Sequence, residues 1–333
     1  MQSLNRNDSV IVYPGQAGRP LYYIPYLAEF ECLKRPRYRI RYNGGEVDVS
    51  LKTAEAILFY GASGSIPVAF LDDASTYRVP ITFHRTHRSE PYLLTPAVSG
   101  GRGDLLTRQI LKREDGRTRL YVAKQFSIAR IESLAWLVPI SKTQTARARQ
   151  ATTLERLRLV EAEASARYWD AYFLALGNPD ANRRDRNPVA KALDAALLLV
   201  RGVLLRWTIH HRLLPSHGYL HEPVVYDALV FDLIEPYRAL IERAVHAAAL
   251  SALPDAITPT VAVEAVKAAL AAPVYVPATQ QTVAAKHLLH GAVLALRAYL
   301  SGDMLRLTLP VPGQRKAGRP FQTSYCLPGN RQG

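Results

Sequence analysis

The spacing of apolar residues changes once along this chain, close to residue 100. Before that point, short apolar runs such as VIVY (10–13), AILFY (56–60), PVAFLD (67–72) and PITFHR (80–85) stand between turn-forming residues, which is typical of a small β-sheet or sandwich. After it, Ala, Leu and Arg recur with helical spacing. Strands followed by helices, rather than alternating with them, predict an α+β protein whose two kinds of element are segregated.

These patterns of residues predict that the chain has four parts. Residues 1–97 form an N-terminal β-domain, 98–104 a Gly-rich linker, 105–308 a larger all-α domain, and 309–333 a flexible basic tail rich in Pro and Gly. Within the β-domain, alternating residues and the turn Asn43-Gly44-Gly45 predict a hairpin over 37–50. Its apolar side chains, Tyr38, Ile40 and Tyr42, share one face, so we expect that face to form a homodimer interface.

The helical part is predicted to contain seven helices. Their expected ranges are 105–126, 128–148, 152–176, 188–212, 225–250, 259–271 and 279–301.

The charge and the apolar content of the chain indicate which kinds of partner and location to expect. Lys and Arg number 42 against 28 Asp and Glu in 333 residues, a formal charge of +14, which favours a polyanion such as DNA because cations on phosphates release counterions. No window offers eighteen uninterrupted apolar residues and the start lacks a signal-peptide pattern, so we expect no membrane span and no secretion. Two cysteines far apart in the chain fit a reducing cytoplasm better than a disulfide framework.

The stretch LPSHGYLHEPVVYDALVFDLIEPYR, residues 214–238, places histidines before a helix and carboxylates inside it. On a helical wheel, Asp232, Glu235 and Glu242 fall opposite a continuous apolar arc. One interpretation is a solvated acidic face. The other is a cation site, in which Asp232 and Glu235 project from one face and His221 closes the site from the preceding loop.

A second helix favours the cation site. Glu161 lies in an apolar row with Leu154, Leu157 and Tyr168, where an acid is costly unless a charge or a metal compensates it. Its neighbour Glu163 lies in line with surface arginines instead. Oxygen ligands with one imidazole suit Mg²⁺ or Mn²⁺ better than Zn²⁺. A zinc site built on His217 and His221 is the weaker alternative, because Pro215 and Gly218 disfavour a helix there.

These motifs resemble those of the Cas1 family, the CRISPR-associated integrases that acquire spacers. LPSHGYLH followed by DALVFDLIEPYR resembles the family's histidine element and acidic helix, and EAEASARYWDAYF resembles its upstream glutamate helix. AILFYG, the stretch 104–134 and the stretch 279–302 resemble further parts, so that the similarity covers most of residues 10–302.

The resemblance implies a β-domain that mediates dimerisation, joined to a helical catalytic domain. It implies metal ligation by Glu161, His221 and Glu235, with Asp232 as a further catalytic acid, and Mg²⁺ or Mn²⁺ as the cofactor. The implied reaction is attack of a DNA 3′-hydroxyl on a phosphodiester of the repeat array, with nicking when water attacks instead. The implied partners are double-stranded and forked DNA, a second copy of the chain, and the small Cas2 protein.

Arginines are the candidates for holding substrate phosphates. We expect them to be Arg147, Arg149, Arg156, Arg158, Arg183, Arg184, Arg186 and Arg238. Two other functions stay open: a related integrase of a mobile element, and a basic DNA-binding protein without catalysis. Metal-dependent nicking would exclude the latter.

Overall fold

A computed structural model describes residues 11–14, 19–84, 92–94, 104–222, 227–313, 322 and 325–328. The chain divides into two compact units. Unit 1 comprises Met1–Gly100 together with Leu198–His210, and unit 2 comprises Gly101–Leu197 and His211–Gly333. The division falls within the stretch predicted to be a linker, which itself lies outside the described residues except for Asp104. The sequence did not indicate that a later segment clusters with the N-terminal unit.

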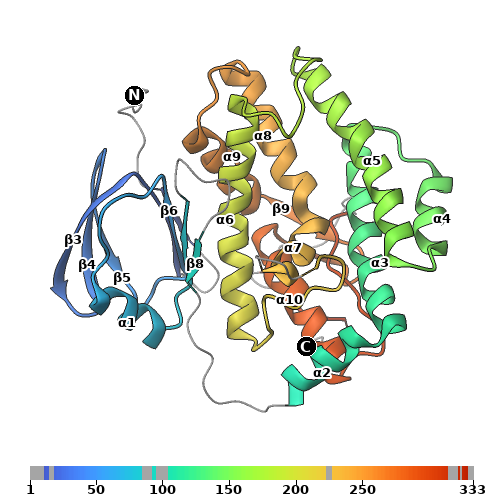
Figure 1. Ribbon diagram of the computed structural model, residues 1–333, viewed down its shortest axis with the longest axis horizontal. Coiled ribbons are helices and arrows are strands. Elements are labelled where there is room, and N and C mark those ends of the chain that lie inside the picture. The colour runs from blue at the N-terminus through green and yellow to red at the C-terminus, as the bar shows by residue number, and fades with distance from the viewer. Residues whose placement is uncertain are drawn as a thin grey trace. The chain divides into compact units, whose positions relative to one another are not determined.

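Unit 1 contains two sheets (Figure 1). The first has the strand order β1 (Ile11–Pro14), β2 (Pro20–Pro25), β6 (Ala56–Tyr60), β7 (Ile81–Phe83) and β8 (Tyr92–Leu94). Its central strands β2, β6 and β7 are parallel, and both edge strands are antiparallel to their neighbours. The second sheet is antiparallel and consists of β3 (Leu27–Lys34), β4 (Arg37–Tyr42) and β5 (Gly45–Ser50).

The run PVAFLD was interpreted as a strand, and this was wrong. Its residues begin helix α1 (Val68–Thr76). The reason is topological: β6 and β7 are parallel neighbours, so the chain must cross over between them, and a helix is the usual crossover. Phe70 of α1 is fully buried among aromatic side chains of both sheets. The apolar residues of PVAFLD therefore pack in the core as part of a helix and not of a strand.

The hairpin 37–50 is confirmed, with Tyr38 opposite Val49 and Ile40 opposite Val47. Its apolar face is not a surface, however. Tyr38 and Ile40 are both 0% exposed, and Tyr38 packs edge-on against Phe70 with ring centroids 5.1 Å apart. The expectation that this face is available for dimerisation was therefore wrong, because α1 and the other sheet provide a core that covers it.

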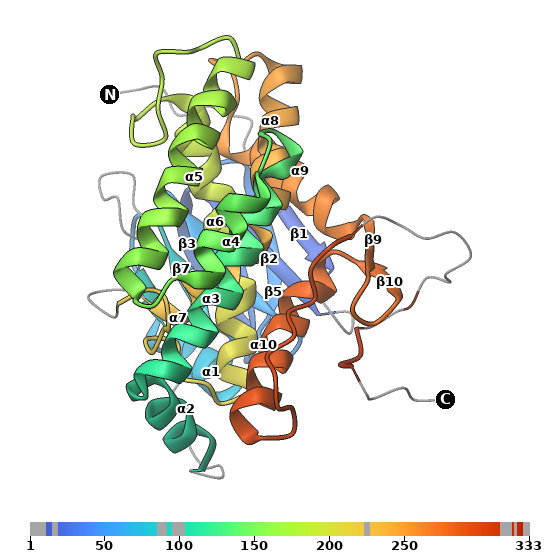
Figure 2. The ribbon, with the colours of Figure 1, turned by 90° about the vertical axis from the view of Figure 1, so that its right-hand side faces the viewer.

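Unit 2 consists mainly of helices that pack around α3 (Figure 2). They are α2 (Asp104–Glu114), α3 (Gly116–Ser133), η2 (Leu134–Trp136), α4 (Lys142–Gln150), α5 (Leu154–Ala175), α6 (Pro188–His210), α7 (Ala228–Ile234), η3 (Glu235–Tyr237), α8 (Arg238–Ala252), α9 (Pro259–Ala271) and α10 (Lys286–Ser301). The last part of α6 belongs to unit 1. A short antiparallel hairpin, β9 (Pro273–Val276) and β10 (Gln281–Ala284), precedes α10.

Four predicted helices have different limits, each for a local reason. The first ends at Glu114 because Asp115 caps α3, its side chain accepting the N–H of Thr118 at 3.1 Å. The predicted helix 128–148 is not one element: α3 continues to Ser133, η2 follows, and α4 begins only at Lys142, where the Ser141 side chain accepts the N–H of Gln144. The predicted helix 225–250 is broken into α7, η3 and α8, with Pro236 at the break. The predicted helix 279–301 begins only at Lys286, because the preceding residues pair with β9.

The predicted flexible tail, 309–333, lies mostly outside the described residues. Those that are described pack on unit 2. Tyr325 is 6% exposed and lies against Gly291 of α10, and the Gln322 N–H donates to the Thr282 carbonyl at 2.7 Å. This part of the tail is therefore bound rather than free. In the part of the chain that is described, no helix combines the length and the apolar character needed to cross a membrane.

Candidate active site

The candidate site begins with Asp232, which is 0% exposed and lies in α7. Its Oδ2 atom accepts the N–H groups of Tyr219 and Leu220, and its Oδ1 atom accepts the N–H of His221 at 3.0 Å. Oδ1 also lies 2.8 Å from His221 Nδ1. One buried carboxylate thus receives three successive backbone N–H groups and an imidazole, which compensates the cost of burying its charge.

The same contact decides which ring nitrogen of His221 bears the proton. An ionised carboxylate only accepts hydrogen bonds, so Nδ1 of His221 donates to Asp232 and the neutral ring carries its lone pair on Nε2. Burial lowers the pKa of His221, but the hydrogen bond to Asp232 and the charges of Asp232, Glu235 and Glu161 outweigh it, and the pKa is raised. His221 therefore lies in the field of all three predicted acids.

The loop that carries His221 is also held from its other side by three arginines. Arg113 of α2 donates to the Gly218 carbonyl at 2.9 Å, and Arg119 of α3 and Arg158 of α5 donate to the Tyr219 and Leu220 carbonyls, each at 3.1 Å. All three guanidinium groups also lie within 4 Å of the Glu222 carboxylate. We call Arg113, Arg119, Arg158 and Glu222 the loop clamp. Sequence reasoning missed three of these residues and assigned Arg158 to DNA.

Glu161 lies on α5, in the apolar row that the sequence indicated, where Leu157 and Tyr168 are 0% exposed. Its Oε1 atom accepts the Ser165 hydroxyl at 2.9 Å. Burial and the charge of Glu235 raise its pKa, in that order of importance. Glu163 points elsewhere: it pairs with Arg147 of α4 at 2.7 Å, while Arg167 reaches only its backbone carbonyl. The surface assignment of Glu163 was correct, but its partner comes from another helix.

Glu235 lies in the 3₁₀ turn η3 and is 3% exposed. Its Oε1 atom accepts Arg238 Nη1 at 3.0 Å, and Oε2 lies 3.7 Å from Arg130 Nε. Among the described residues, no group donates a hydrogen bond to Oε2, although this atom is buried. A buried acceptor in this condition is a position that a cation would satisfy.

Behind Glu235 lies a buried charge network that the sequence did not indicate. Arg130 of α3, 1% exposed, binds Glu242 through two hydrogen bonds of 2.8 and 3.0 Å, and Arg238 Nε lies 3.4 Å from the same carboxylate. Burial opposes ionisation of Glu242, but Arg130 and Arg238 lower its pKa. Two arginines thus balance Glu235 and Glu242.

The acids of residues 232–242 therefore do not form a solvated face. Asp232 and Glu242 are 0% exposed and Glu235 3%, so this alternative is wrong. An apolar arc on one side of a helix does not imply solvent on the other when α3 and the His221 loop cover that side. The only sequence signal for the buried role of Arg130 is its position. It is a basic residue in the largely apolar stretch 126–137, seven residues before Leu137.

The donor set fits a hard divalent cation chemically, with two carboxylates and one imidazole. Glu161, His221 and Glu235 come from α5, the His221 loop and η3. The charge of Glu235 contributes to the raised pKa of Glu161, and the charges of both acids contribute to the raised pKa of His221. In the described ranges, however, no three His, Cys, Asp or Glu side chains already have the arrangement of a cation site. Residues 214–222 form a loop rather than a helix, so His217 and His221 do not present the paired face that a helical zinc motif would need.

The arginines expected to hold DNA differ in what they contact. Arg147 and Arg149 are exposed but paired, with Glu163 and Glu132. Arg183 pairs with Asp194 and lies over Trp169, and Arg238 is engaged with Glu235 and Glu242. Three are exposed, and none of these forms an ion pair with another described residue: Arg156, Arg184 and Arg186. A role in DNA binding stays a prediction for all eight.

Known proteins are similar to this chain in fold, and a family model matches part of its sequence. The sequence model of the family described as CRISPR-associated protein Cas1 matches residues 26–252, more than half of the chain. A casposase bound to an integration product is similar over 91% of this chain and 96% of its own, with a TM-score of 0.74 and 18% identity.

Two further solved structures agree. A Cas1 protein from Thermotoga maritima aligns with 89% of this chain and 99% of its own, with a TM-score of 0.70 and 16% identity. A chain of a Cas6-RT-Cas1–Cas2 complex aligns with 90% of this chain and 37% of its own, with a TM-score of 0.70 and 11% identity. At these identities the structural matches establish the fold alone.

Proposed function

Because the chain belongs to the Cas1 family of CRISPR-associated proteins, we propose that it is a metal-dependent DNA integrase and endonuclease that inserts spacer DNA into a CRISPR array. The observation that carries the proposal is the convergence of Glu161, His221 and Glu235 from three separate elements, with one buried oxygen of Glu235 lacking a hydrogen-bond donor among the described residues. A chain that only bound DNA would have no reason to bear the cost of such a cluster.

The reaction is a transesterification. A DNA 3′-hydroxyl attacks the phosphorus of a phosphodiester, the new P–O bond forms, and the bond to the leaving 3′-oxygen breaks. Mg²⁺ or Mn²⁺ held by Glu161, His221 and Glu235 would supply the positive charge that this transition state needs. With water as the nucleophile, the same site nicks DNA.

The protein's own groups prepare this site. Asp232 fixes the ring of His221 so that Nε2, not Nδ1, carries the lone pair. Arg130 and Arg238 balance Glu235 and Glu242, so among these three glutamates only Glu161 has no arginine in hydrogen-bond contact in the described part of the chain. Burial and the charge of Glu235 raise its pKa, and a bound cation would favour its ionised form.

DNA would be held chiefly through phosphates. The net charge of +14 supports binding that depends on DNA structure more than on sequence and that weakens steeply with salt. Arg156, Arg184 and Arg186 are the first candidates, while Arg147 and Arg149 would have to exchange a surface carboxylate for a phosphate, which costs little. Forked and double-stranded DNA, Cas2 and a second copy of the chain are the proposed partners, acting in the cytoplasm.

One alternative has an observation in its favour. The casposase match is as extensive as the match to the Thermotoga protein, so an integrase serving a mobile element is the second candidate. A CRISPR array and a gene for Cas2 beside the gene for this chain would support the first function. Their absence, with integration activity intact, would support the second.

The test of the active site compares Glu161→Ala, His221→Ala and Glu235→Ala with Glu163→Ala. We expect the first three to lose strand transfer and nicking in Mg²⁺ or Mn²⁺ and to retain near-normal DNA affinity. Glu163→Ala should behave like the parent, because its side chain is at the surface with Arg147. Full activity in all four variants would place the chemistry elsewhere. An inactive Glu163→Ala beside an active Glu161→Ala would also reject the site.

A further inference from the structure

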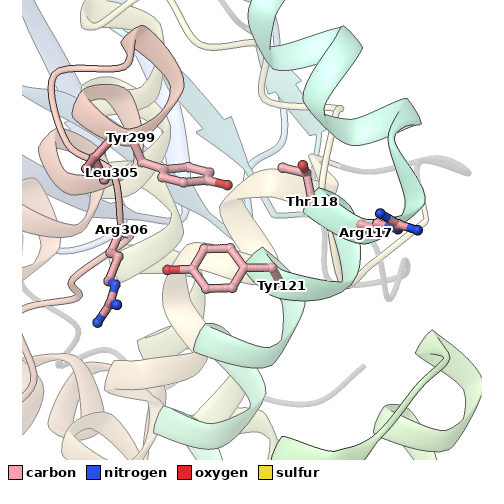
Figure 3. A pocket seen from close by; sticks show the side chains of 6 residues that line it. All are labelled: Arg117, Thr118, Tyr121, Tyr299, Leu305 and Arg306. Atoms are coloured by element: carbon pink, nitrogen blue, oxygen red, sulfur yellow. The ribbon is translucent and has the colours of Figure 1, made fainter.

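A pocket of about 340 Å³ lies in unit 2, between the start of α3, the end of α10 and the segment that follows α10. It is not part of the site described above. Its lining combines two basic, two aromatic, one hydroxyl and one apolar side chain: Arg117, Thr118, Tyr121, Tyr299, Leu305 and Arg306 (Figure 3).

Tyr121 is held in place at this pocket. Its hydroxyl accepts the N–H of Leu307 at 3.0 Å, and its ring centroid lies 5.6 Å from that of Tyr299. Tyr299 is itself 9% exposed, with Lys112 Nζ 4.0 Å from its ring centroid. Tyr121 therefore offers a partly exposed aromatic surface whose position is already fixed, so a ligand that stacks on it would lose little side-chain entropy on binding.

Two arginines line the same pocket. In Figure 3 Arg306 lies near the hydroxyl end of Tyr121, and Arg117 lies beyond its backbone end with the guanidinium pointing away from the ring. Both are exposed, and neither lies within ion-pair distance of a carboxylate in the part of the chain that is described. Two other cations nearby are differently engaged: Arg108 donates to the Ser301 carbonyl and Lys112 to the Tyr299 carbonyl at 2.8 Å, at the C-terminal end of α10.

We propose that this pocket binds an unpaired nucleotide of a DNA strand, with the base against Tyr121 and the adjacent phosphates on Arg117 and Arg306. An aromatic platform between cations is how proteins hold single strands without reading their sequence. An acidic peptide would use the two arginines but gain little from the ring, or from Leu305, which is 94% exposed at the edge of the pocket. The proposal rests on the proposed function, which brings DNA to this unit.

The ring is tested with two variants that both lack the hydroxyl, one with an aromatic and one with an aliphatic side chain. Tyr121→Phe and Tyr121→Leu both lose the hydrogen bond from Leu307, but only Tyr121→Leu loses the platform. Fluorescence anisotropy in EDTA, which prevents catalysis, would compare a duplex with a single-stranded tail and a blunt duplex of the same length. We expect Tyr121→Leu to bind the tailed duplex about tenfold more weakly than Tyr121→Phe, and the two variants to bind the blunt duplex equally.

The arginines are tested against a cation elsewhere. Arg117→Ala and Arg306→Ala should each weaken binding of the tailed duplex selectively and reduce its salt dependence, whereas Arg243→Ala, an exposed arginine of α8, should weaken tailed and blunt duplexes alike, if at all. Thermal unfolding of each variant shows whether it is folded.

Three results would each overturn the proposal. Tyr121→Leu and Tyr121→Phe could bind the tailed duplex equally well, or all three arginine variants could show the same small effect. The parent protein could also bind the tailed and the blunt duplex with the same affinity. Unchanged tail binding together with lost binding of Cas2 would assign the pocket to a protein partner instead. A parent that prefers tails but performs no strand transfer would contradict the proposed function and not this site.

Discussion

The Asp232 carboxylate accepts hydrogen bonds from both the backbone N–H and the Nδ1 of His221, at 3.0 and 2.8 Å. With the N–H groups of Tyr219 and Leu220 it receives four donors in all, which uses the acceptor capacity of its two oxygens. We therefore propose that Asp232 is a positioning residue, which orients His221 and shapes the loop, while Glu161 and Glu235 would keep oxygens for a cation.

Asp232→Asn tests this assignment. The amide would present an NH₂ group to N–H donors, leaving at least one buried donor without an acceptor, which costs about 1–3 kcal/mol. We expect strand transfer to be lost and the melting temperature to fall, whereas Glu161→Gln, whose carboxylate accepts only the Ser165 hydroxyl among the described residues, should lose activity with a smaller change in melting temperature. An Asp232→Asn protein as stable and active as the parent would contradict the role.

The loop clamp provides a second prediction. Glu222→Gln removes the charge that the guanidinium groups of Arg113, Arg119 and Arg158 share. We expect faster hydrogen exchange at the amides of residues 219–221 and a reduced rate of strand transfer, with DNA affinity unchanged. Glu114→Gln is the control, because Glu114 is largely exposed and pairs only with Arg113 among the residues that the structure describes. Unaltered exchange at these amides in Glu222→Gln would show that the backbone contacts suffice.

The buried network predicts a contrast in stability. Glu242→Gln leaves Arg130 without its bidentate anion at a site where both side chains are at most 1% exposed, so the free energy of unfolding should fall by about 3–5 kcal/mol. Glu132→Gln breaks an exposed pair with Arg149 and should cost less than about 1 kcal/mol. Denaturant unfolding of both variants measures the difference. Equal losses would mean that the network is not desolvated as described.

Unit 1 should have a specific weakness to acid. The hydrogen bonds from Arg35 lower the pKa of Asp73, against the effect of burial, and the Tyr38 hydroxyl donates to the same carboxylate at 2.6 Å. A group with a lowered pKa stabilises the folded state above its unfolded pKa, near 4, and this stabilisation is lost as the pH falls through the folded value.

Asp73→Asn should therefore melt below the parent at pH 6, and the difference should shrink steadily once the pH falls below about 4. Parallel melting curves of the two proteins from pH 6 to pH 2.5 measure it. A difference that stayed constant to the lowest pH would show that the charge of Asp73 is not what stabilises this contact.

The homodimer stays a prediction, but the apolar face of the hairpin 37–50 no longer supports it. Tyr38 and Ile40 belong to the core of unit 1, so they no longer support a dimer. The outer face of the same sheet carries cross-strand pairs such as Arg39–Asp48 and Arg41–Glu29 instead. Sedimentation of the full chain decides the oligomeric state. A fragment beginning at 104 would not, because its residues 198–210 would lack the rest of the unit with which they cluster.

What the sequence determined by itself was local or periodic. The hairpin at Asn43-Gly44, the α+β order, and the row that separates Glu161 from Glu163 follow from turn chemistry and from the 3.6-residue repeat, which depend on neighbours in the chain. Glu161 could be named because an acid in an apolar row is costly. Glu235 could be named because it shares a helical face with Asp232, and His221 because it precedes that helix, and the motifs of all three resemble those of a known family.

The tertiary structure alone decided which surfaces are covered. It turned PVAFLD into the crossover helix α1, buried the hairpin face that was expected to form a dimer, and placed Arg130 opposite Glu242, 112 residues later in the chain. It also placed Arg158 against the loop that carries His221, where its guanidinium donates to the Leu220 carbonyl. The physical reason is that burial and charge compensation depend on distances between segments far apart in sequence, and the residue pattern of one helix does not say what packs against it.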